Sequence, residues 1–328
     1  MPLRRTGTAL ALALLLAGGF PAVAAAENTV AFTLRDARIT ESSGLARDVA
    51  GGFYWTVNDS GSAGVVFGVQ PDGSVRGTLN YRAAPQDVEA VAVHENRLYV
   101  ADIGDNGGSR AMVTVYYFMN PRASGLTVTY NAIDFRYPDG PHDAETLLVD
   151  GTGRLFLVTK GLQGGGIYAA PTNPSRTVTN VLSRVADAPA LVTDGAFLPD
   201  GRIALLTYAS VEVLDGTSYA KVADGAIPLQ RQAESLTVSL AGDSLLVGSE
   251  GRASKVYAVP VPGAPAPAPT PTAEPSATSS AATDDGGEVD ADVPAATAGG
   301  RGTLLAVGLA AVVAVVAGVV VALVRKPG

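Results

Sequence analysis

The stretch Asp87-Val-Glu-Ala-Val91, followed by the turn His94-Glu-Asn96 and the apolar run Leu98-Tyr-Val-Ala101, decides the fold. It places an acidic residue, a second polar residue and a small residue ahead of an apolar strand, and a turn and a second strand follow. The unit occurs five times, with its marked polar residue at positions 43, 89, 145, 194 and 234. Four antiparallel strands that recur every 40 to 50 residues are typical of a β-propeller blade.

Residues 27–260 contain no helical periodicity, and short apolar strands alternate there with Asp-Gly and Gly-Gly turns, which predicts an all-β domain. The length of this segment favours five blades. Six blades are the alternative, if the long second unit hides an extra one. The last unit lacks one strand, so we expect the N-terminal strand Thr29 to Leu34 to complete the fifth blade and close the ring.

The two ends of the chain predict export and membrane anchoring. A basic n-region, a short apolar core and small residues mark residues 1–26 as a signal peptide. Residues 261–302 are a Pro/Ala/Thr-rich acidic segment without apolar periodicity, which predicts a disordered stalk. Residues 303–324 carry no charge and are long enough for one transmembrane helix, with residues 325–328 as a cytoplasmic tail. We therefore expect a single-pass cell-membrane protein whose propeller, residues 27–260, lies outside the cytoplasm.

Charge and composition narrow the classes of partner. The formal charge of −8 divides into −5 for the stalk, +4 for the two ends and −7 for the predicted propeller. An acidic domain with two histidines excludes nucleic acid as a partner class. The chain has no cysteine, so its stability comes from core burial and ions rather than disulfides. We expect a monomeric ectodomain whose ligand is a small molecule, a phosphorylated compound or a cell-envelope component.

The repeated units direct their acidic residues to one face of the predicted ring, the face at which the first strands begin. The carboxylates placed there are Glu41, Asp87, Glu89, Asp143, Glu145, Asp194 and Glu234. Crowded carboxylates have raised pKa values unless a cation or a hydrogen-bond donor compensates their charge. All-oxygen ligands without cysteine indicate a hard cation, Ca²⁺ before Mg²⁺. Three roles stay open: hydrogen bonds that fasten neighbouring blades, metal binding, and catalysis.

Three residues at this face are candidates for catalysis: His142, Lys160 and Glu145. His142 has the chemistry of a metal ligand, a general base or a phosphate contact, and its alternative is a solvated loop histidine. Lys160 ends a second strand, where it would meet either an anionic substrate or Glu145. The sequence contains neither the Gly-x-Ser-x-Gly elbow of serine hydrolases nor the His-Glu-x-x-His motif of zincins, so no motif supports either enzyme class.

Several of these stretches resemble exported bacterial propellers named for an esterase-like activity of phytase, which are distantly similar to β-propeller phytases. The stretches are Glu41-Ser-Ser-Gly-Leu, Trp55-Thr-Val-Asn-Asp-Ser-Gly61, Tyr99-Val-Ala-Asp-Ile-Gly-Asp-Asn106, Tyr137-Pro-Asp-Gly-Pro-His-Asp-Ala-Glu145, Val158-Thr-Lys160, Gln232-Ala-Glu234 and Ser249-Glu-Gly251. The resemblance implies a carboxylate-lined face, which in phytases holds Ca²⁺ beside a basic phosphate pocket. Basic residues near this face are few, namely Lys160, Arg110 and Arg252.

Two functions of different class follow. The scarcity of basic residues favours a cation-stabilised ligand-binding or scaffold module displayed at the cell surface. The family resemblance favours a Ca²⁺-dependent, phytase-like phosphoesterase, with Glu89, Asp143 and Glu145 as ligands of the cation.

Overall fold

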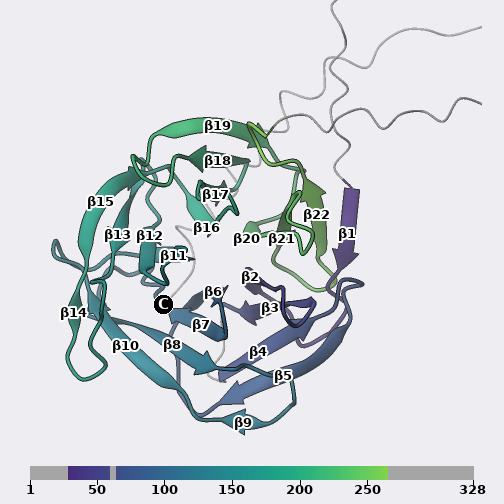
Figure 1. Cartoon of the computed structure of the whole chain (residues 1–328), viewed down its shortest axis with the longest axis horizontal. Helices are drawn as coiled ribbons and strands as arrows, with labels where there is room; N and C mark the ends of the chain where they lie inside the picture. Colours follow the sequence, from purple (N-terminus) through teal and green to yellow (C-terminus); the bar gives the residue numbers. More distant parts are fainter. Residues whose placement is uncertain (1–28, 60–63, 265–328) are drawn as a thin grey trace, which may run out of the picture. The chain divides into compact units, whose positions relative to one another are not determined.

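The computed structural model describes residues 29–59 and 64–264. Within these residues the strands form five sheets around a common centre (Figure 1), so the prediction of an all-β, five-bladed propeller is confirmed. The predicted signal peptide, transmembrane helix and cytoplasmic tail, and nearly all of the predicted stalk, lie outside the described residues. In the described part of the chain, no helix has the length and apolar character needed to cross a membrane.

Each blade contains four antiparallel strands, and we number the blades in chain order. Blade 1 consists of β2 (Ser42–Asp48), β3 (Phe53–Asn58), β4 (Gly64–Val69) and β5 (Val75–Tyr81). Blade 2 consists of β6 (Val88–His94), β7 (Arg97–Asp102), β8 (Val113–Met119) and β10 (Asn131–Arg136). Blade 3 consists of β11 (Ala144–Val149), β12 (Leu155–Thr159), β13 (Gly165–Ala169) and β15 (Ser183–Ala188).

Blade 4 consists of β16 (Val192–Phe197), β17 (Ile203–Thr207), β18 (Ser210–Leu214) and β19 (Lys221–Ala226). Blade 5 consists of β20 (Ala233–Val238), β21 (Leu245–Ser249), β22 (Lys255–Val259) and β1 (Thr29–Thr33). Two short strands, β9 (Thr127–Val128) and β14 (Asn180–Val181), pair in parallel with the outer strands β5 and β10.

The N-terminal strand closes the ring, as the sequence predicts. Strand β1 pairs antiparallel with β22 and places Thr29 opposite Ala258 and Thr33 opposite Lys255. The inner strands β2, β6, β11, β16 and β20 contact one another in cyclic order, and β20 returns to β2. Blade 5 therefore combines both ends of the folded segment, and its β22 edge is covered rather than exposed.

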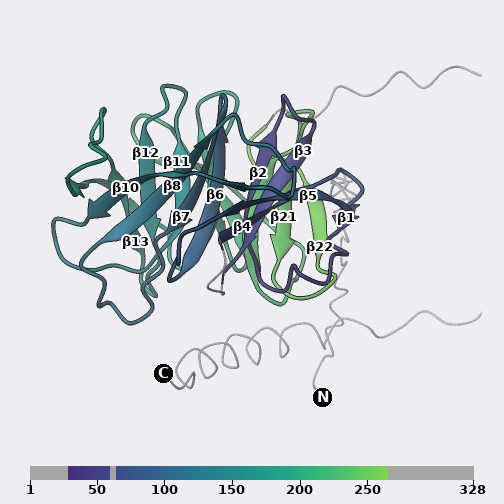
Figure 2. The ribbon, with the colours of Figure 1, turned by 90° about the horizontal axis from the view of Figure 1, so that it is seen from below.

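Apolar residues are buried mainly between neighbouring blades. Trp55 of blade 1 packs in one cluster with Leu98 of blade 2, and Phe135 of blade 2 packs with Leu147 of blade 3. The inner strands are buried along much of their length because they are covered by blades on both sides. Seen from the side, β2 and β6 run from one face of the ring toward the other (Figure 2). We call the face where the inner strands begin the entrance face, and the face where they end the exit face.

If β1 holds the ring closed, removing its buried aromatic side chain will destabilise the propeller. Phe32 is 5% exposed and stacks on Tyr54 at 5.6 Å, whereas Val30 on the same strand is 46% exposed. We expect Phe32→Ala to lower the free energy of unfolding by about 3 kcal/mol, and Val30→Ala by less than about 0.5 kcal/mol. Urea denaturation measures both. Equal losses in the two variants would contradict the role of β1 in closing blade 5.

Candidate functional site

Each of the five inner strands carries a β-bulge close to the entrance face. The bulged residues, which the register between inner and second strand skips, are Gly44, Glu89, Glu145, Thr193 and Glu234. A bulge re-aims a side chain away from the alternating pattern of the strand. In the first unit the bulged residue is Gly44, one residue after the marked polar position 43. In the fourth unit it is Thr193, one residue before the marked position 194. Three of the five bulged positions therefore carry glutamate.

Polar residues beside the bulges fasten neighbouring blades together. The Ser43 hydroxyl donates to the Glu89 carbonyl oxygen at 2.6 Å, and the Thr193 hydroxyl donates to the Ala233 carbonyl oxygen at 2.6 Å. Asp194, which is buried, accepts the backbone N–H of Leu236 at 2.6 Å. Burial raises the pKa of Asp194 well above its ordinary value, although backbone N–H groups oppose that rise. The environment of Asp194 is thus that of a fastening between blades 4 and 5.

Three carboxylates of blades 1 and 2 form a group that could bind a metal ion. Asp59 follows β3, Asp87 precedes β6 and Glu89 lies in the β6 bulge. One oxygen from each lies within 4.8 Å of the others. A Cβ atom on Gly104 would come within 2.5 Å of both Asp87 Oδ2 and Glu89 Oε1. Glycine at position 104 therefore gives these carboxylates their room, and we call Asp59, Asp87 and Glu89 the acidic triad.

The acidic triad is electrostatically unfavourable without a compensating charge. Burial raises the pKa of Asp59 to about 7, and the neighbouring Asp87 carboxylate adds to the shift. The pKa of Asp87 is also raised by burial, and that of Glu89 lies well above its ordinary value because of burial and the charge of Glu145. No lysine or arginine forms an ion pair with these three residues in the described ranges. Protons or a bound cation must therefore neutralise part of their charge.

A second polar group, from blades 3, 4 and 5, contains Lys160. Its ammonium Nζ lies 2.7 Å from Glu145 Oε1 and 5.3 Å from the centre of the Tyr208 ring. Burial is the largest single influence and disfavours the charged form of Lys160, but Glu145 and Tyr208 together raise the lysine pKa. Burial also raises the pKa of Glu145 to about 7 despite Lys160. With both pKa values raised, Lys160 stays protonated near neutral pH, and Glu145 is the residue of this pair that exchanges a proton there.

Glu234 extends this group in blade 5. Gln232 donates a side-chain hydrogen bond to Glu234 Oε1, so the side chains of these two residues project together. Burial raises the pKa of Glu234 to about 8, and a hydrogen bond and the charge of Glu250 add to the shift. The carboxylates of Glu89, Glu145 and Glu234 therefore influence one another across the centre of the ring.

The remaining predicted residues lie outside the acidic triad, and the charge of Asp143 contributes to the raised pKa values of Asp87 and Glu145. His142 Nε2 hydrogen bonds to Asp139 at 3.0 Å and to the Tyr168 hydroxyl at 3.1 Å, and its ring packs against Tyr137. Asp143 Oδ1 accepts the backbone N–H of Asp105 at 2.8 Å. The half-buried Glu41 accepts the backbone N–H of Asp59 at 2.9 Å through its carbonyl oxygen. None of these three residues belongs to the acidic triad.

The loop after β7 supports the triad. Arg110 forms an ion pair with Asp102 at 2.9 Å and donates to the Gly104 carbonyl oxygen at 2.7 Å. Asp105 accepts the backbone N–H of Arg110 at 2.8 Å, which closes the loop. Arg110 therefore fixes Gly104 beside the triad instead of facing a ligand. Asp59 is not among the carboxylates that the sequence repeat assigns to this face, and its only sequence signal is the stretch Trp55-Thr-Val-Asn-Asp-Ser-Gly61. The corresponding signal for Gly104 is the glycine of the Asp-Ile-Gly-Asp-Asn block.

No family model and no curated protein matches the chain. Among solved structures, a gluconolactonase from Xanthomonas campestris is 15% identical, with a TM-score of 0.42, over 69% of this chain and 88% of that chain. A luciferin-regenerating enzyme is 11% identical, with a TM-score of 0.41, over 72% of this chain and 96% of that chain. The resemblance to phytase-like propellers stays a prediction.

The raised carboxylate pKa values predict how stability depends on pH and on Ca²⁺. Asp59, Glu145 and Glu234 have folded-state pKa values of about 7, 7 and 8, against roughly 4 in an unfolded chain. Without a cation, their contribution to stability is fully present below about pH 4 and is lost as the pH rises through 7 and 8. We expect the Tm of the chelator-treated protein to fall over this range.

Calcium will reverse this loss at pH 8 and do much less at pH 5, where protons occupy the carboxylates. At 100 times its Kd, a ligand adds about 2.7 kcal/mol, or roughly 5 to 10 °C for a domain of this size. Differential scanning calorimetry of the full-length chain, with EDTA or with Ca²⁺, measures the shift. Asp87→Asn will abolish it, while Asp187→Asn, an exposed acid on β15, will retain it. A Tm independent of Ca²⁺ at pH 8 would contradict metal binding.

Proposed function

We propose that this protein is a Ca²⁺-dependent hydrolase of esters, with its active site at the entrance face. The acidic triad carries the proposal, because three close carboxylate oxygens in a buried setting require a cation or protons. Phosphomonoesters are the substrate class that the phytase-like sequence features favour. Few cationic side chains surround the site, which favours a substrate with one phosphate over one with many.

The donors of the triad fit Ca²⁺. Oxygen ligands around Ca²⁺ stand about 2.3 to 2.6 Å from the ion, so two ligands of one ion are separated by up to about 5 Å. The 4.8 Å limit for Asp59, Asp87 and Glu89 agrees with that geometry. The cleared space at Gly104 lies against two of the three donors. When bound there, Ca²⁺ would polarise an ester oxygen and acidify a water molecule.

Two glutamates of the entrance face have the proton chemistry that hydrolysis needs. General acid–base groups work best when their pKa lies near the working pH. Burial raises the pKa of Glu145 to about 7 and that of Glu234 to about 8. The ammonium of Lys160, at 2.7 Å from Glu145, orients that carboxyl group and stabilises its charged form. Glu145 and Glu234 can thus take up and return a proton beside the triad.

A binding or scaffold module is the second candidate, and one observation favours it. The cationic groups near the triad already have partners within the protein: Lys160 with Glu145, and Arg110 with Asp102. In this alternative the cation serves to stabilise a face that holds a small-molecule, phosphorylated or cell-envelope ligand. For either function we propose that the propeller is displayed outside the cytoplasm on a membrane-anchored stalk, which the sequence of both chain ends supports.

Hydrolysis assays with Ca²⁺ test the first candidate. The full-length chain is assayed on phosphomonoesters, carboxylic esters and lactones, which a bound cation can polarise. We expect Glu89→Gln to lower kcat/KM by about 100-fold or more, since even outer-shell partners of metal sites cost 10 to 100-fold. Asp187→Asn, with a side chain 92% exposed, will stay within about twofold of the parent.

Glu145→Gln separates proton transfer from cation binding. Because Glu145 lies outside the triad, this variant will keep the Ca²⁺-dependent Tm shift and lose kcat. If the parent hydrolyses none of the three ester classes but retains the Tm shift, the hydrolase proposal fails and the binding module stands. If Glu145→Gln is as active as the parent, its proposed proton-transfer role is wrong.

A further inference from the structure

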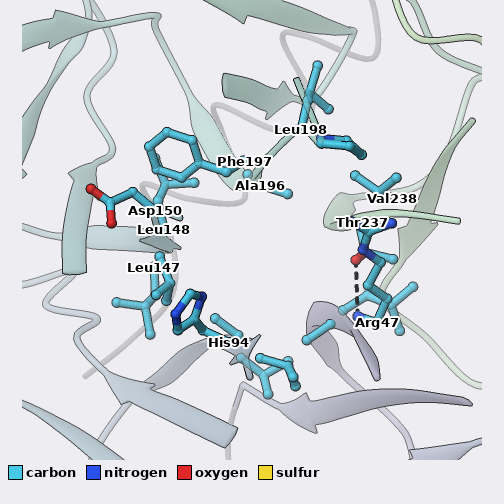
Figure 3. A pocket seen from close by; sticks show the side chains of 18 of the residues that line it. Arg47, His94, Leu147, Leu148, Asp150, Ala196, Phe197, Leu198, Thr237 and Val238 are labelled. Atoms are coloured by element: carbon cyan, nitrogen blue, oxygen red, sulfur yellow. Dashed lines mark hydrogen bonds between the residues drawn. The ribbon is translucent and has the colours of Figure 1, made fainter. Parts of the chain in front are cut away.

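A cavity opens into the central channel on the exit face, away from the acidic triad. Its volume is about 290 Å³, and all five inner strands contribute to its wall (Figure 3). Strand β6 connects the two faces, because Glu89 lies near its start and His94 at its end. Five residue steps of about 3.3 Å separate these positions by roughly 17 Å along the strand. The exit-face cavity is therefore a separate site.

The ionisable groups that line this cavity are Arg47, His94 and Asp150. Asp150 is committed to its own turn, since its Oδ1 accepts the backbone N–H of Thr152 at 2.8 Å and that of Arg154 at 3.0 Å. Its carboxylate projects away from the middle of the cavity in Figure 3. The ionisable side chains that remain for a ligand in the cavity are consequently Arg47 and His94.

Arg47 is a half-buried cation without an acidic partner. Its guanidinium donates to the carbonyl oxygen of Ser239 at 3.3 Å, and no ion pair joins it to a carboxylate in the described part of the chain. Burial lowers the pKa of Arg47, because the guanidinium loses water without gaining a counter-charge. An arginine in this state gains stability from an anion, and its planar N–H groups suit carboxylate or phosphate oxygens.

His94 supplies a second polar group to the wall from the neighbouring blade. The structure records no hydrogen bond or ion pair from His94 to another described residue. A Cβ atom on Gly153, which has a φ of +83°, would lie 3.4 Å from His94 Nε2, so the glycine turn leaves the ring its space. Phe197, Leu198 and Val238 add apolar surface around the same opening.

We propose that the exit-face cavity binds a small organic anion, with its carboxylate or phosphate group on Arg47 and the rest of the molecule against His94, Phe197, Leu198 and Val238. The inference does not depend on the proposed hydrolase activity. The cavity volume lies at the lower end of the range for small-ligand sites, for which apolar walls and a few placed polar groups are typical.

Phenylphosphonate and benzoate are suitable probes because neither is an ester. Isothermal titration with the full-length chain in EDTA leaves the acidic triad without its cation. We expect a Kd below about 1 mM for at least one probe, and a loss of about tenfold in Arg47→Gln, as expected for a charge-assisted hydrogen bond. His94→Gln will weaken binding less, and Arg47→Lys will restore part of the affinity. A melting curve confirms that each variant is folded.

Two further variants locate the binding. Arg122→Gln removes an exposed arginine outside the cavity and will bind like the parent. Asp87→Asn removes a triad carboxylate and will also bind like the parent, which shows that the probe does not occupy the entrance face. The proposal is overturned if the parent binds neither probe at millimolar concentration, if folded Arg47→Gln binds as tightly as Arg122→Gln, or if Asp87→Asn alters the affinity.

Discussion

The β-bulge near the start of each inner strand is the constraint on which the entrance face depends. In a regular strand, side chains alternate between the two faces of the sheet. The bulge removes one residue per blade from this alternation and re-aims its side chain. Glutamate at three of these positions, Glu89, Glu145 and Glu234, brings carboxylates together around the centre of the ring. At the first position Gly44, with a φ of +72°, lies so close to blade 2 that a Cβ would come within 2.8 Å of the Val91 nitrogen. The residue at the bulge therefore decides both the charge of the face and how closely two blades approach.

Crowded carboxylates oppose folding, and the chain offsets only part of that cost. Lys160 neutralises Glu145, and backbone N–H groups stabilise Asp194. The acidic triad receives no comparable partner, which is why its pKa values are raised by burial and by mutual repulsion. Ring closure by β1 and the packing between blades supply the stability that such a face requires. Neutral residues would pack there at a lower electrostatic cost, so the crowded carboxylates are the feature on which the proposed function rests.

The architecture could be predicted from sequence because each step depends on local signals. Turn residues, strand lengths and the recurring unit give five blades, and the missing strand of the last unit assigns β1 to blade 5. Which residue of each inner strand is bulged could not be predicted, since a bulge is a shift in strand register that no fixed residue type marks. Asp59 joins the triad only through contact between two blades. The sequence likewise left open whether Lys160 meets an anionic substrate or Glu145. The distance of 2.7 Å between Lys160 Nζ and Glu145 Oε1 identifies Glu145 as its partner.

The two ends of the central channel carry different ionisable groups. The entrance face is a carboxylate cluster, whereas the exit-face cavity has Arg47 as a cation without an acidic partner. Along β6 the two ends are roughly 17 Å apart, about twice the Debye length at physiological ionic strength. Direct charge coupling through solvent between them is therefore weak. The inner strands are packed on both sides, so a ligand bound at one end can shift the strands only slightly. Binding at one end therefore has little effect on the structure of the other end. Each end can thus hold a ligand whose charge is opposite to that of the end itself, without an energetic penalty from the other end.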